Sequence, residues 1–197
     1  MDNKSQIDFF KLEIEKINKF FVKKDYELII KKTKEIIKKF PKTIQPYNIL
    51  GIAYRKQEKV NEAKQVFLDA LKINPNSYSL MTNLGSVYKH LNNFSKSEEM
   101  YLKALKIKSN YTPALENYAN LKREKNEIHE SIELYEKAYK ISSNSESVLL
   151  SLSATYQIVG KFDLSKKFLK ILTQKFPNNT IADKMLSDLL DYSFEKD

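Results

Sequence analysis

Three cationic side chains recur at a spacing of 34 residues, and such a row could bind carboxylates. They are Arg55, Lys89 and Arg123, in a chain that has only two arginines beside 32 lysines. A guanidinium presents paired, planar donors that match a carboxylate, so its recurrence favours a site for the acidic groups of a ligand. The alternative is that each cation stabilises the carboxyl end of a helix by roughly 0.3–1 kcal/mol, which lysine would do equally well.

Amide and hydroxyl side chains accompany these cations and could hold a peptide backbone. An amide carries both a donor and an acceptor, so it can pair with a peptide group whatever the neighbouring side chain. Asparagine is also frequent throughout this chain, and solvation alone would account for it equally well. We expect the peptide-binding residues to be Asn48, Arg55, Asn83, Ser86, Lys89, Asn117, Asn120 and Arg123.

No residues are spaced as catalytic or metal-binding groups are. The chain has no cysteine, its only histidines are His90 and His129, and its three glycines form no phosphate-binding loop. We therefore expect no enzymatic activity, no cofactor and no metal.

The spacing of 34 residues belongs to a sequence repeat that must position these groups. With Ile44 as position 1, small residues recur at positions 8 and 20 and large ones at position 24. Position 8 holds Gly51, Gly85, Ala119 and Ser153; position 20 holds Ala63, Ser97, Ser131 and Ser165; position 24 holds Phe67, Tyr101, Tyr135 and Leu169. Small residues let two helices approach closely, and the large ones fill the space around that contact.

The repeat predicts a pair of helices, one over positions 2–14 and one over positions 17–30. Position 15 between them holds Glu58, Asn92, Asn126 and Gly160, of which the last three tolerate the left-handed conformation that ends a helix. Lys122 at position 11 and Leu172 at position 27 depart from the pattern, and we expect them to loosen the packing of the last two repeats.

This pattern resembles the tetratricopeptide repeat family, whose repeats of 34 residues carry the same small, large and aromatic positions. The resemblance implies an all-α, right-handed superhelical solenoid of antiparallel helix pairs. It also implies a peptide-binding groove lined by positions 2, 5, 6, 9, 12 and 13 of each first helix. Asn83 and Asn117 at position 6 resemble the asparagine ladder in the repeats of O-linked N-acetylglucosamine transferases.

The frame divides the chain into seven segments. We expect a frayed N-terminus at 1–9, a degenerate capping repeat at 10–43, regular repeats at 44–77, 78–111, 112–145 and 146–179, and a C-terminal capping helix at 180–197. In that last helix, one face would carry Ile181, Met185, Leu186, Leu189 and Leu190.

Composition adds an expected location. The formal charge of +9 comes mostly from lysine and is spread along the chain. The start MDNKSQIDFF lacks the order of a secretory signal, and no apolar run is long enough for a membrane span. We expect a cytoplasmic protein without membrane insertion.

The leading functional prediction is a non-catalytic scaffold that binds an extended, acidic peptide. The alternative is that the repeats belong to a larger enzyme and recruit its substrate protein, because the ending ADKMLSDLLDYSFEKD is similar to the junction between such repeats and bacterial sulfotransferase domains, and repeats also precede glycosyltransferase domains. RNA binding is disfavoured, because the groove has no aromatic row. Self-association through a terminal helix stays open.

Overall fold

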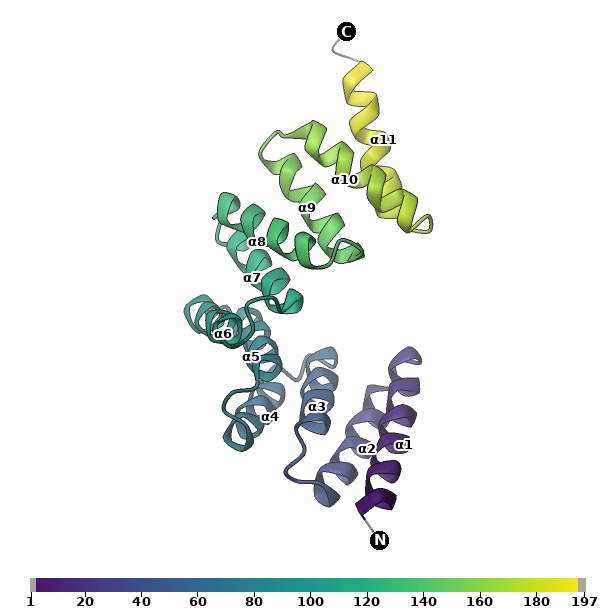
Figure 1. Cartoon of the computed structure of the whole chain (residues 1–197), viewed down its shortest axis with the longest axis vertical. Helices are drawn as coiled ribbons and strands as arrows, with labels where there is room; N and C mark the ends of the chain where they lie inside the picture. Colours follow the sequence, from purple (N-terminus) through teal and green to yellow (C-terminus); the bar gives the residue numbers. More distant parts are fainter. Residues whose placement is uncertain (1–2, 195–197) are drawn as a thin grey trace. The chain divides into compact units, whose positions relative to one another are not determined.

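A computed structural model describes residues 3–194 of the chain and the side chains of residues 9–191. These residues form eleven α-helices and no strand, which confirms the predicted all-α class. The helices fall into two compact units, residues 1–107 and 108–197. Each unit is a stack of antiparallel helix hairpins (Figure 1).

The first unit holds six helices and the second holds five. Those of the first unit are α1 (Asn3–Val22), α2 (Tyr26–Lys39), α3 (Ile44–Lys56), α4 (Val60–Ile73), α5 (Tyr78–His90) and α6 (Phe94–Ile107). Those of the second are α7 (Thr112–Glu124), α8 (Ile128–Ile141), α9 (Glu146–Ile158), α10 (Phe162–Lys175) and α11 (Thr180–Phe194). The odd-numbered helices are the first helices of the repeats, here called A helices, and the even-numbered ones are the B helices.

Helix boundaries follow the repeat closely. Every B helix from α2 to α10 spans positions 17–30, as predicted, and the A helices α3, α5, α7 and α9 span positions 1–13. The helix α1 starts at Asn3, well before the boundary at residue 10 expected from the sequence; residues 1 and 2 lie outside the described part.

The turn from each A helix to its B helix is the same motif. The residue at position 15 has a positive φ in every repeat, and the N–H of the residue after it donates to the carbonyl five residues earlier. This is a Schellman motif, which satisfies carbonyls at the end of the helix. The conformation is adopted by Asn92, Asn126 and Gly160, as predicted, and also by Lys24 and Glu58.

Close contact at position 8 lets each A helix pack on its B helix. A Cβ atom added to Gly51 would lie 2.3 Å from Cζ of Phe67, and one added to Gly85 would lie 2.6 Å from Cε1 of Tyr101. Both rings are almost fully buried. The glycines are therefore required by the rings that cover them.

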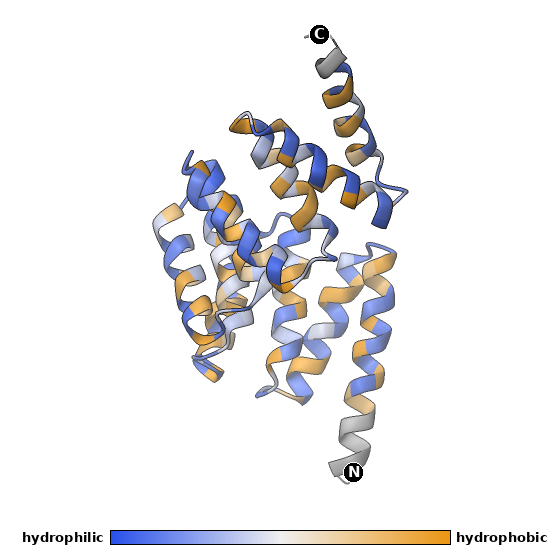
Figure 2. Cartoon of the chain, turned by 45° about the horizontal axis from the view of Figure 1, so that its top comes forward, coloured by the Kyte–Doolittle hydropathy of each residue, from blue (hydrophilic) through white to orange (hydrophobic). Residues whose placement is uncertain are grey.

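Apolar side chains of neighbouring hairpins form the cores of the two units. Figure 2 shows apolar and polar stretches alternating along the helices, as expected for helices that bury one face. In the second unit α11 adds Ala182 and Leu189 to the core, whereas Ile181 and Leu190 of its predicted apolar face are 60% and 39% exposed.

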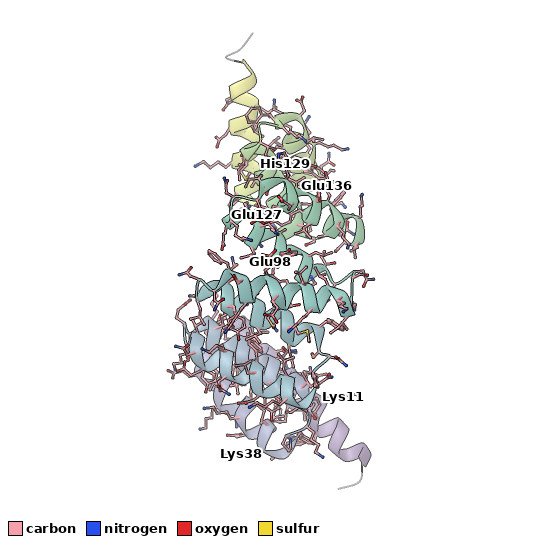
Figure 3. All side chains as sticks on the ribbon, turned by 90° about the vertical axis from the view of Figure 1, so that its left-hand side faces the viewer. Lys11, Lys38, Glu98, Glu127, His129 and Glu136 are labelled. Atoms are coloured by element: carbon pink, nitrogen blue, oxygen red, sulfur yellow. The ribbon has the colours of Figure 1, made fainter. Side chains whose placement is uncertain are left out.

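The two departures from the repeat are both buried, fully at Leu172 and mostly at Lys122. Lys122 donates to the carboxylate of Glu127 and lies 5.4 Å from the ring centroid of Tyr118. Glu127, labelled in Figure 3 beside α8, also accepts from Lys125 at 2.7 Å. An ion pair thus replaces the usual tyrosine at position 11.

We predict that Gly51→Ala lowers the free energy of unfolding by about 1–3 kcal/mol, because the new methyl group overlaps the Phe67 ring. Chemical denaturation measures the change. In the background of Phe67→Leu, the loss of unfolding free energy caused by Gly51→Ala should be much smaller. The resulting pair of alanine and leucine resembles the natural pair Ser153 and Leu169. An equal loss in both backgrounds would contradict the steric explanation.

We predict an acid-dependent contribution from Glu127. Hydrogen bonds from Lys122, then from Lys125, lower the pKa of Glu127 below its ordinary value of 4.5. A lowered pKa in the folded state stabilises the protein above about pH 4.5, and this stabilisation is lost as the pH falls through the folded value. Glu127→Gln should therefore be less stable than the wild type at neutral pH and lose that difference in acid.

Denaturation at a series of pH values tests this prediction. The control is Glu130→Gln, which removes an exposed carboxylate from the first turn of α8. A pH-independent difference between Glu127→Gln and the wild type would show that the ion pair contributes nothing through its charge.

Candidate functional site

The predicted binding residues lie along one side of the A helices. At 100° per residue, positions 2, 5, 6, 9, 12 and 13 fall within a stripe about 120° wide. In the first unit the A helices α3 and α5 contact each other directly, so their stripes are continuous there. Asn48, Arg55, Asn83, Ser86 and Lys89 belong to this unit, and Asn117, Asn120 and Arg123 belong to α7 of the second unit.

In the first unit two of the predicted asparagines bind each other. The amide nitrogen of Asn83 donates to Oδ1 of Asn48 at 2.9 Å, and the amide nitrogen of Asn48 donates to Oγ of Ser79 at 3.3 Å. Ser79 is in turn 3.2 Å from Oγ of Ser77, which caps α5. These bonds fix the orientation of both amides, and Oδ1 of Asn83 keeps no partner among the described residues.

The second unit uses the same repeat positions with a carboxylate in place of an amide. Glu116, at the position of Asn48, accepts from Ser147 at 2.7 Å and from Ser145 at 3.4 Å. Asn117, at the position of Asn83, makes no hydrogen bond to the described residues. Position 5 therefore links one A helix to the start of the next in both units.

Ser86 and Asn120 at position 9 have a structural partner inside each repeat. Oγ of Ser86 is 3.2 Å from the hydroxyl of Tyr101, and Oδ1 of Asn120 accepts from the hydroxyl of Tyr135 at 2.7 Å. Both tyrosines are fully buried, so their hydroxyls require a polar partner.

The other two repeats support this explanation, since neither has a buried hydroxyl at position 24. There Phe67 accompanies Ile52 at position 9, and Leu169 accompanies Ala154. Among the four regular repeats, a polar residue stands at position 9 only where a tyrosine stands at position 24. The sequence carries this signal, and Ser86 is only 6% exposed.

The three predicted cations differ in their surroundings. Arg55 is half-buried and has no hydrogen bond or ion pair with a described residue. Lys89 is half-buried as well and does interact with its surroundings. Nη2 of Arg123 donates to Oδ1 of Asn120 at 3.3 Å, so this guanidinium is already held beside the Tyr135 hydroxyl.

Burial raises the pKa of the Tyr135 hydroxyl, although the nearby Arg123 charge acts in the opposite direction. Burial also raises the pKa of the Tyr156 hydroxyl, and its hydrogen bond to the Glu136 carboxylate raises that pKa further. Both hydroxyls therefore stay protonated and serve as hydrogen-bond donors.

The histidines form no metal site. His90 in the first unit lies 3.1 Å from Oε2 of Glu58, and His129 belongs to α8 of the second unit (Figure 3). Within the described residues, no group of three or more histidine or acidic side chains is arranged to hold a metal ion. None of the described helices has the length and apolar character that crossing a bilayer requires.

Comparison with known proteins gives the family. Sequence models of the tetratricopeptide repeat match residues 45–77, 78–111 and 112–145, slightly more than half of the chain. The chain belongs to the tetratricopeptide repeat family. Such repeats are scaffolds for protein interaction, and this chain is placed in that functional class. No curated protein sequence matches it.

Solved structures of other proteins share the fold, and two of those below are described as tetratricopeptide proteins. TTC0263 of Thermus thermophilus is 12% identical with a TM-score of 0.80, over 91% of this chain and 98% of that protein. PilF of Pseudomonas aeruginosa is 13% identical with a TM-score of 0.74, over 87% and 78%. YrrB, described as a tetratricopeptide protein with an unusual peptide-binding site, is 13% identical with a TM-score of 0.62, over 82% and 83%. These similarities confirm the solenoid of helix pairs.

We predict that Asn120 and Tyr135 stabilise the second unit jointly. Asn120→Ala leaves the buried hydroxyl without its acceptor and should lower the free energy of unfolding by about 1–3 kcal/mol. In the background of Tyr135→Phe the same substitution should cost much less, so that a double-mutant cycle shows a coupling near 1 kcal/mol. The matched control is the cycle of Ala154→Gly and Leu169→Ile, two positions that share no hydrogen bond and should show little coupling. Zero coupling between Asn120 and Tyr135 would overturn the structural explanation.

Proposed function

We propose that this tetratricopeptide chain binds an extended, acidic peptide along its A helices, with α3 and α5 of the first unit as the main contact. The observation that carries the proposal is Arg55. It is a half-buried guanidinium on the predicted stripe, without a partner among the described residues.

Electrostatics supports an acidic ligand. A guanidinium with no described ion pair gains most from a carboxylate, which it can bind through two parallel hydrogen bonds. Lys89 occupies the same repeat position on the neighbouring A helix α5, and the two cations would meet successive acidic groups of one chain. Arg123 holds the same repeat position in α7 of the second unit, as part of the stripe of that unit.

Ordered amides support an extended backbone. Asn48 and Asn83 hold each other in a fixed orientation, and Oδ1 of Asn83 is available to accept a peptide N–H. In the second unit Asn117 has both its donor and its acceptor available, and Asn120 has its amide nitrogen. Side chains that are ordered before binding lose less entropy when the ligand arrives.

The similarity to YrrB supports only the general class of ligand. That protein is described as having a peptide-binding site, and at 13% identity the comparison carries no residue across. The acidic character of the ligand rests on the residues of this chain alone.

We predict that removing the three cations abolishes capture of the groove ligand. The variant Arg55→Ala, Lys89→Ala and Arg123→Ala should lose a defined set of proteins from a pull-down with lysate of the source organism, identified by mass spectrometry. It should also bind a fluorescein-labelled Glu-Ser-Glu-Ser-Glu-Ser peptide at least about tenfold more weakly, because three partly desolvated ion pairs are lost.

The control removes the same charge from the B helices. Lys38→Ala, Lys106→Ala and Lys140→Ala lie on α2, α6 and α8, and all three side chains are exposed; Lys38 is labelled in Figure 3. This variant should keep the captured proteins and the affinity for the acidic peptide. Equal losses in both variants would show that net charge, and not the A-helix cations, determines binding.

A further inference from the structure

A second, chemically different site lies between the last helices of the second unit. A pocket of about 400 Å³ opens there, lined by Gln157 of α9, Phe162 of α10 and three residues of α11. Those three are Met185, Asp188 and Leu189. Its volume is within the range of small-ligand pockets, and its walls are mostly apolar with few polar groups, as is usual for binding sites.

The repeat frame shows that the residues of this pocket correspond to positions on the predicted stripe of the first unit. At position 12, the pocket has Gln157 and the first unit has Arg55. At position 6 of the following A helix, the pocket has Met185 and the first unit has Asn83. At position 9 of that following A helix, the pocket has Asp188 and the first unit has Ser86. Compared with the first unit, the pocket has a neutral amide in place of the cation and an apolar side chain in place of the amide. It also has a carboxylate in place of the serine.

The polar groups of the pocket have not been used inside the protein. Asp188 is exposed and makes no hydrogen bond or ion pair with a described residue, and the same holds for the amide of Gln157. Two further apolar side chains of α9 and α10 are exposed: Ile158 is 58% exposed and Leu164 is 36% exposed. A smaller hollow that is also lined by Phe162 includes Leu164.

We propose that this pocket binds an arginine or lysine of a partner peptide, next to a large apolar residue. The methylene stem of the cation would lie against Met185 and Leu189, and its charged end would pair with Asp188. The neighbouring apolar residue would lie against the apolar lining of the pocket. An acidic side chain would meet the Asp188 carboxylate and be repelled.

This site is independent of the acidic-peptide site proposed above. It lies on α9, α10 and α11, it uses none of the same residues, and it selects the opposite charge. A ligand that uses both would carry an acidic segment and a basic, apolar segment.

Nuclear magnetic resonance of the full chain tests the inference with two matched probes. Acetyl-Leu-Arg-Leu-amide should shift backbone amide signals of residues in α9, α10 and α11, with saturation at millimolar concentrations. Acetyl-Leu-Glu-Leu-amide should bind about two- to fivefold more weakly, which is the range for one partly exposed ion pair. Signals of α3 and α5 report separately on the first unit, so either site can fail without the other.

A charge reversal at the pocket provides the decisive variant. Asp188→Lys changes an exposed residue and should invert the preference, so that the glutamate peptide binds more tightly than the arginine peptide. The control Asp183→Lys makes the same charge change at an exposed position of α11 that does not line the pocket, and it should keep the original preference.

Three results would overturn the proposal. One is the absence of saturable shifts in α9 to α11 with the arginine peptide. Another is equal affinity of the wild-type chain for the two peptides. The last is the same inversion in Asp183→Lys as in Asp188→Lys, which would reduce the effect to the overall charge of the helix.

Discussion

The contact between a small residue on each A helix and the ring or branched side chain opposite it determines the rest of the architecture. Where Gly51 faces Phe67 and Gly85 faces Tyr101, the ring lies so close that even a methyl group would overlap it. That closeness fixes how far apart the two helices of a hairpin lie. The spacing of the hairpin then determines which side of the A helix is covered and which is left for a ligand.

The serines at position 20 strengthen the same contact. Ser97 and Ser131 donate to the backbone carbonyls of Gly85 and Ala119 at 2.8 Å, whereas Ser165 is buried without a partner among the described residues. A small side chain is thus tolerated at this position with or without its hydrogen bond. Steric fit is the common requirement, and the hydrogen bond is an addition in two repeats.

Helix positions and the first-to-second-helix turns were predictable from the sequence, because they depend on local rules that every repeat obeys. The left-handed residues Asn92, Asn126 and Gly160 follow from their types, whereas Lys24 and Glu58 adopt that conformation because the hairpin on either side requires it. The contacts along the predicted binding face were harder to foresee. The bond between Asn48 and Asn83 and the bonds of Ser86 and Asn120 to buried hydroxyls each join two helices, so no single stretch of sequence shows them. The pocket beside Asp188 depends on how α9, α10 and α11 meet, which no single stretch of sequence encodes.

The bond between positions 9 and 24 has a consequence for how such a protein can change its partners. Position 9 lies on the predicted ligand side, but in two repeats its chemistry is dictated by a ring in the interior. A mutation that alters specificity there is tolerated only if the tyrosine loses its hydroxyl in a second step, or if the first mutation keeps a polar group. The repeats that already carry Phe67 and Leu169 are free of this restriction. New binding chemistry can therefore evolve, or be engineered, most readily at Ile52 and Ala154.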